Sequence, residues 1–142
     1  MVLTRITLIM ASAALMSACA AQQFSYEAQP RFGPPAAQTV IRQVFEEQPQ
    51  QYRPLRVEFT NDALRLQVVG FRSDFASGAT AVVTETEAYY FSNLAEPKLF
   101  QKRATWRVLL ASGNGLVKRL VIFTTYDRAK EFLDAIASLR KK

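Results

Sequence analysis

The most regular hydrophobic pattern lies near the C-terminus, where apolar residues recur every three or four positions. The series comprises Ala129, Phe132, Leu133, Ile136 and Leu139. This spacing places the apolar side chains on one face of an α-helix. The polar residues off that face are Lys130, Glu131, Asp134 and Ser138. Thr124 or Thr125 suits the N-cap position. The pattern therefore predicts a C-terminal helix that buries its apolar face against the rest of the domain.

Residues 55–124 mostly alternate between apolar and polar positions, which is typical of β-strands. Residues 55–59 and 64–68 flank the turn-forming pair Asn61-Asp62 and are expected to form a hairpin. Further strands are expected over 80–87, 88–92, 98–111 and 116–125. In the last of these, one face carries Val117, Arg119, Val121 and Phe123. Loops are expected at 70–78 and 93–97, and Ser112–Gly115 is the clearest turn.

A shorter helical pattern precedes the strands. Val40 and Val44 are four residues apart, as are Ile41 and Phe45, so the four side chains form one apolar stripe. Thr39 is a candidate cap and Pro49 ends the pattern. We expect a short helix over residues 39–48 that docks on the main body.

The first nineteen residues have the features of an export signal. Arg5 precedes an apolar run over residues 6–16, which is too short for a transmembrane helix of about 20 residues. The run leads to Leu15-Met16-Ser17-Ala18-Cys19, which resembles a bacterial lipobox, with Met16 where leucine is commonest. The resemblance implies a signal peptide over residues 1–18. It also implies cleavage before Cys19 and attachment of diacylglycerol and fatty acyl chains, such as palmitate, to that cysteine.

The residue after Cys19 bears on the destination of the protein. In lipoproteins of double-membrane bacteria, aspartate at that position usually signals retention in the inner membrane, and here the residue is Ala20. The resemblance therefore implies an outer-membrane lipoprotein that faces the periplasm. The alternative is a plain secreted protein, cut after Ala18 or Ala20, with one spare thiol.

Residues 19–38 are expected to form a flexible tether between the lipidated cysteine and the domain. They contain three prolines, one glycine and four glutamines, which disfavour a helix or a strand. Phe24, Tyr26 and Phe32 offer the alternative of a partner-binding segment. The predicted organisation is thus a signal peptide (1–18), a tether (19–38) and one α+β domain (39–142).

The order of elements over residues 55–140 resembles a pleckstrin-homology-like domain. The segments that carry the resemblance are 57–66, as the opening hairpin, and 123–136, as the last strand running into the helix. The resemblance implies a small antiparallel barrel or sheet of about six or seven strands, closed by the C-terminal helix. The alternative is another α+β sheet with its helix packed on one face.

The composition limits which reactions and metal sites the chain can carry. The chain has 142 residues, no histidine and one cysteine, which excludes Ser-His-Asp and Cys-His catalysis, a zinc cluster and an intrachain disulfide. Glu85 and Glu87 are two residues apart on one strand and could form a catalytic carboxylate pair, but same-strand glutamates usually lie in solvent at a sheet edge. We therefore expect no enzyme, no cofactor and no metal.

Basic residues are the more informative signal, because the net charge is +6. The cluster consists of Lys98, Lys102, Arg103, Arg107, Lys118 and Arg119. If the strands that carry them are neighbours, the six cations share one side of the sheet and can bind anionic headgroups or acidic polymers. The alternative is an ordinary charged surface neutralised by acids. Because the predicted signal exports the protein from the cytoplasm, we expect no nucleic acid among its partners.

Three functions from different classes remain. The first is a membrane-anchored binding or scaffolding module, which contacts a protein, peptide or glycan of the envelope and needs no catalytic group. The second is a lipid-handling protein, which requires an apolar pocket or a basic face. The third is an envelope hydrolase, which requires a cleft with converging carboxylates. The sequence favours the first.

Overall fold

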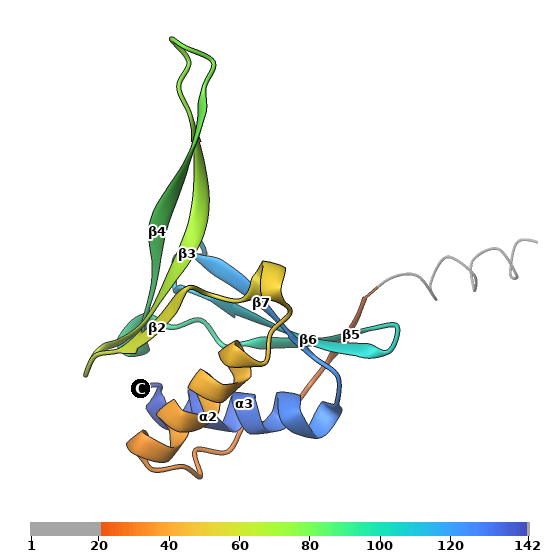
Figure 1. Cartoon of the computed structure of the whole chain (residues 1–142). Helices are drawn as coiled ribbons and strands as arrows, with labels where there is room; N and C mark the ends of the chain where they lie inside the picture. Colours follow the sequence, from red (N-terminus) through yellow and green to blue (C-terminus); the bar gives the residue numbers. More distant parts are fainter. Residues whose placement is uncertain (1–20, 142) are drawn as a thin grey trace, which may run out of the picture.

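The computed structural model describes residues 21–141 (Figure 1). These residues form an α+β fold with two α-helices and seven strands in two antiparallel sheets. The four-stranded sheet has the order β1 (Gln22–Phe24), β5 (Lys98–Lys102), β6 (Thr105–Ala111) and β7 (Lys118–Phe123). The three-stranded sheet has the order β2 (Arg56–Phe59), β3 (Ala63–Ser73) and β4 (Thr80–Tyr90). The helices are α2 (Pro34–Glu46) and α3 (Tyr126–Leu139), and short 3-10 turns lie at Gln50–Tyr52 and Phe91–Asn93.

The α+β class, the antiparallel strands and the C-terminal helix are confirmed. The barrel is not, because within the described residues the strands form two open sheets. A pleckstrin-homology-like fold is therefore not confirmed. Neither helix in residues 21–141 is long and apolar enough to span a bilayer.

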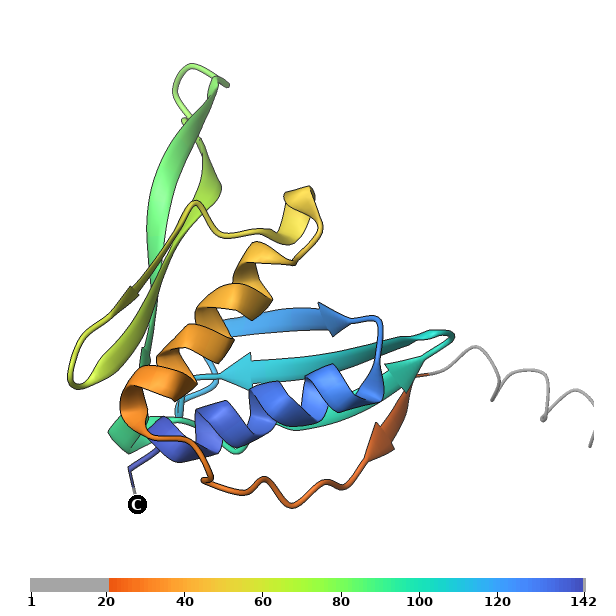
Figure 2. The ribbon, with the colours of Figure 1, turned by 60° about the horizontal axis from the view of Figure 1, so that its bottom comes forward.

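The core lies between the two helices and the two sheets, and the three-stranded sheet contributes Leu64, Leu66 and Tyr89 to it. α3 lies along one face of this sheet, and α2 crosses α3 (Figure 2). Phe132 of α3 is fully buried, with its ring centroid 5.4 Å from that of Phe123 on β7 and 6.0 Å from that of Phe45 on α2. Thr125 caps α3 by accepting a hydrogen bond from the Arg128 amide, as the sequence indicated. The predicted apolar face of α3 is confirmed as core.

The buried side chain of Gln48 covers part of the free edge of β7. Its Oε1 accepts from the Ile122 amide at 2.9 Å, and its Nε2 donates to the Ile122 carbonyl at the same distance. The glutamine amide thus acts as a single extra strand residue and satisfies backbone groups that an edge strand leaves unpaired. It fixes the end of α2 to the sheet.

The prediction of a flexible tether over residues 19–38 is wrong for the part of it that the structure describes, residues 21–38. β1 pairs with β5 in the register Gln22↔Gln101, and residues 26–32 lie on α3. α2 begins at Pro34 instead of Thr39, because proline at the first turn of a helix gives up an amide that has no partner there. Thr39 lies inside the helix and donates its hydroxyl to the Pro35 carbonyl.

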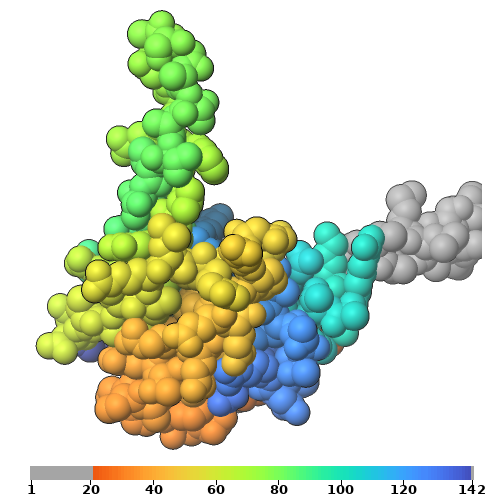
Figure 3. Space-filling model, in the orientation of Figure 1, coloured from red at the N-terminus to blue at the C-terminus, as the bar shows by residue number. Residues whose placement is uncertain are grey.

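Three strand assignments also differ from expectation. Residues 98–111 form two strands, joined by a turn at Arg103 and Ala104 that lets β5 pair with β6. Residues 80–90 form one strand instead of two, and β3 continues through Gly70 to Ser73. Beyond Gln67, β3 has β4 as its only strand partner, so these two strands project as an arm (Figures 1 and 3). The arm exposes Val69, Phe71, Phe75 and Val82.

Candidate functional site

The strand register divides the predicted basic residues between the two faces of the four-stranded sheet. Leu99, Val108 and Val121 are buried on the face that α3 covers. Side chains alternate along a strand, so their neighbours point to the opposite face, which no described helix covers. Four of the predicted cations lie there: Lys98, Lys102, Arg107 and Lys118. We call this surface the basic face.

The cations of the basic face have no carboxylate partner among the described residues. The ion pairs of residues 21–141 involve other side chains. Arg107 has only a long contact, 3.5 Å, from its Nε to the Thr105 hydroxyl. The apolar residues Phe100, Leu109, Leu120 and Ile122 share this face. The surface is therefore positive, partly apolar and open to solvent.

Arg103 extends the basic face at one end. It occupies the turn between β5 and β6 and is exposed. Its φ of 56° lies in the left-handed region, where glycine is favoured and where a side chain costs about 1–2 kcal/mol. A cation therefore occupies a position at which glycine would be the more stable choice.

Arg119 does not belong to the basic face, so this part of the prediction is wrong. It pairs with Leu110, whose side chain is buried on the α3 side of the sheet. Its Nε and Nη2 donate to the two carboxylate oxygens of Glu87 at 2.7 and 3.0 Å, and its Nη1 donates to the Tyr52 carbonyl. Burial lowers the pKa of Arg119, but the hydrogen bonds and charge of Glu87 outweigh it and raise the pKa. This ion pair joins β7 to β4 of the other sheet.

The same contacts account for the carboxylate pair Glu85 and Glu87. Glu87 also accepts from the hydroxyl of Tyr89, whose pKa is raised, first by burial and then by the charge of Glu87. Glu85 lies over Gly70, where a Cβ atom would come within 2.5 Å of its carboxyl carbon. Glu87 is thus held by an ion pair, and Gly70 makes room for Glu85. The structure therefore explains both carboxylates without a catalytic role: Glu87 pairs with Arg119, and Glu85 packs over Gly70.

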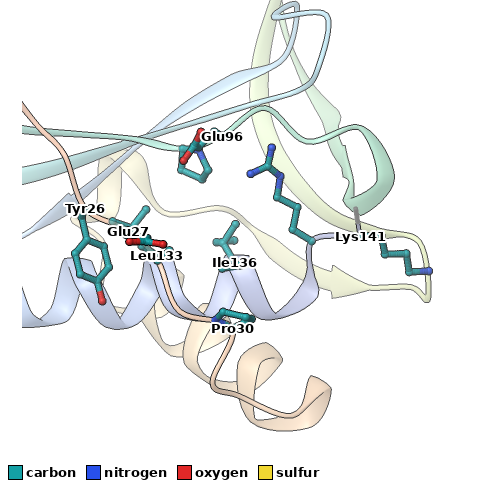
Figure 4. A pocket seen from close by; sticks show the side chains of 11 residues that line it. Tyr26, Glu27, Pro30, Glu96, Leu133, Ile136 and Lys141 are labelled. Atoms are coloured by element: carbon teal, nitrogen blue, oxygen red, sulfur yellow. The ribbon is translucent and has the colours of Figure 1, made fainter.

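A hollow of about 320 Å³ lies between residues 26–30, the loop before β5, and α3 (Figure 4). Leu133 and Ile136 form its apolar floor. Glu27 and Glu96 lie on one side of it in Figure 4, and Lys141 lies at the other end. The volume is at the lower limit of small-molecule sites. Sequence reasoning missed this hollow, because its wall is a segment that was expected to be a tether.

Asp134 is a further feature of this region that the sequence analysis did not single out. It lies on α3 with its side chain 5% exposed, beneath residues 26–31. It accepts hydrogen bonds from the Tyr26 hydroxyl at 2.9 Å, the Gln29 amide at 2.8 Å and the Arg31 Nε at 2.9 Å. Burial and the bond to Asp134 raise the pKa of Tyr26. Asp134 therefore fixes the N-terminal segment to α3.

Comparison of the chain with protein-family models, with curated proteins and with solved structures found no match. The predicted signal peptide and the lipidation site Cys19 lie outside the described residues, which begin at Ala21.

Proposed function

We propose that this chain is a non-enzymatic lipoprotein of the bacterial envelope, anchored through lipidated Cys19, whose basic face binds an anionic partner. The anchor places it at the outer membrane, on the periplasmic side. The protein acts there as a binding or scaffolding module.

One observation carries the proposal: five cations occupy an uncovered sheet face and the adjoining turn, and none has a carboxylate partner within residues 21–141. Unneutralised positive charge attracts anions over about one Debye length, roughly 8 Å at physiological ionic strength. The exposed apolar residues beside these cations, such as Leu120, add contact area for a partner.

Binding is tested by co-sedimentation of the unlipidated chain from residue 19, with Cys19→Ser, which contains every described element of the fold. We expect it to sediment with vesicles containing phosphatidylglycerol at low salt, but not with pure phosphatidylcholine, and to be released at about 1 M salt. Replacement of all five cations (Lys98, Lys102, Arg103, Arg107 and Lys118) by glutamine should abolish binding. A matched control is Arg65→Glu with Arg72→Glu, at exposed positions of the three-stranded sheet. Binding that is absent, or that survives loss of the five cations, contradicts the proposal.

The anchor is tested separately, by metabolic labelling of cells with a tagged fatty acid. The wild-type chain should carry the label, and Cys19→Ser should remain an unlabelled precursor. Equal labelling of both refutes the lipid anchor but leaves the binding experiment valid.

A further inference from the structure

The position of β1 fixes where the N-terminal chain meets the domain. Gln22 pairs with Gln101, the residue before Lys102, and β1 runs antiparallel to β5. β1 therefore begins at the end of the sheet where β5 and β6 are joined by the Arg103 turn (Figure 2). Cys19 precedes Gln22 by three residues, a distance of at most about 10 Å.

The cations of the basic face are not equally close to this entry point. Lys102 and Arg103 lie at the same end of the sheet. Lys98 and Lys118 lie toward the other end, and Lys98 is four residues along β5 from Lys102, about 13 Å. This separation exceeds one Debye length at physiological ionic strength, about 8 Å.

The remaining charges at the entry end do not cancel this positive charge. α3 begins there, because β7 ends opposite Trp106, near the start of β6. Its first turn carries Asp127, which is paired with Lys130 at 3.1 Å, and Arg128, which is paired with Glu47 and Glu131 at 2.8 Å each. The helix N-terminus itself contributes a partial positive charge. The left-handed backbone of Arg103 places a cation at the tip of this end at a cost in stability.

We infer that the β5–β6 turn, through Lys102 and Arg103, rests on the anionic phospholipid headgroups of the membrane that holds the anchor. The inference rests on the proposed function, because it takes Cys19 as the lipidated residue. The domain is then held end-on at the membrane surface instead of being lifted from it by a tether. Lys98 and Lys118, at the far end of the same face, lie beyond the reach of the headgroups.

Two charge reversals of equal size distinguish this orientation from binding by the whole face. The near variant is Lys102→Glu with Arg103→Glu, and the far variant is Lys98→Glu with Lys118→Glu. One basic residue near an anionic surface contributes about fivefold to binding. The near variant should therefore weaken binding to phosphatidylglycerol-containing vesicles by at least about 25-fold, and the far variant by less than about threefold. Equal losses in both overturn the end-on orientation and leave the proposed function standing, whereas no loss in either contradicts both.

A second measurement uses the lipidated chain in the same vesicles, with one fluorophore on an introduced cysteine. Ala104→Cys places the label in the β5–β6 turn, and Leu116→Cys places it near the far end of the sheet, where the side chain is 84% exposed. A headgroup-attached quencher should reduce the emission at position 104 much more than at position 116. The near reversal should reduce that difference. Equal quenching at the two positions overturns the inference even if the reversals weaken binding.

Discussion

Asp134 is the residue whose removal tests the N-terminal packing most directly. Asp134→Ala deletes the acceptor of three hydrogen bonds, from the Tyr26 hydroxyl, the Gln29 amide and the Arg31 guanidinium. A hydrogen bond to a charged group contributes about 1.5–3 kcal/mol, but Arg31 is half exposed and regains water when its partner is removed. We therefore expect a loss of about 2–4 kcal/mol from a total stability of about 5–15 kcal/mol.

Urea denaturation of the chain from residue 19 measures this loss. The matched control is Asp127→Ala on the same helix, where the side chain is 92% exposed and its ion pair with Lys130 is worth about 0.5 kcal/mol. Hydrogen exchange adds a local measurement, because the Gln29 amide should lose its protection in Asp134→Ala. If the two variants are equally stable, or if the Gln29 amide stays protected, Asp134 does not hold the segment and the reasoning is refuted.

Three further predictions follow from single contacts. Phe132→Ala should cost about 3–5 kcal/mol in the same urea titration, because the ring is fully buried between Phe45 and Phe123; a loss below about 1 kcal/mol would contradict its place in the core. Arg103→Gly should raise stability by about 1 kcal/mol, because glycine relieves the left-handed backbone, and should weaken vesicle binding. Burial raises the pKa of Tyr89, so the unfolded tyrosine loses its proton near pH 10 while the folded one keeps it. The stabilising contribution of Tyr89 is therefore full below about pH 10 and declines above it, and Tyr89→Phe should flatten the fall of stability in that range.

The parts of the fold that the sequence predicted are those specified by neighbouring residues. The apolar period of α3, the β2–β3 hairpin and the turn at 112–115 each depend on a signal within a few residues. The docking of residues 22–32 has no such signal. Tyr26 and its partner Asp134 are 108 positions apart, and Asp134 lies off the apolar stripe of its own helix. Its burial follows from tertiary contacts that no local pattern encodes.

The basic face was predicted in part, and the error could have been found in the sequence. Neighbouring residues on a strand point to opposite faces, so Lys118 and Arg119 cannot share one. Alternation already placed Arg119 with Val121 and Phe123, which are buried. The ion pair with Glu87 was not foreseeable, because it requires the position of one sheet relative to the other. The sequence also could not show that the sheets stay open, because barrel closure depends on pairing between distant strands.

The packing of the N-terminal segment also links Asp134 to the orientation of the anchored domain. While residues 22–32 stay on β5 and α3, only three residues of chain connect Cys19 to Gln22, which pairs with β5 next to the β5–β6 turn. If the segment detaches, residues 20–33 become the connection, and their extended length rises to about 45 Å. Asp134→Ala should therefore reduce headgroup quenching of the label at position 104 in the lipidated protein, although Asp134 is neither basic nor near the turn. Asp127→Ala lies nearer the turn and removes a negative charge, so it should not reduce this quenching. Undiminished quenching in Asp134→Ala would mean that Lys102 and Arg103 hold the turn at the membrane without help from the short connection.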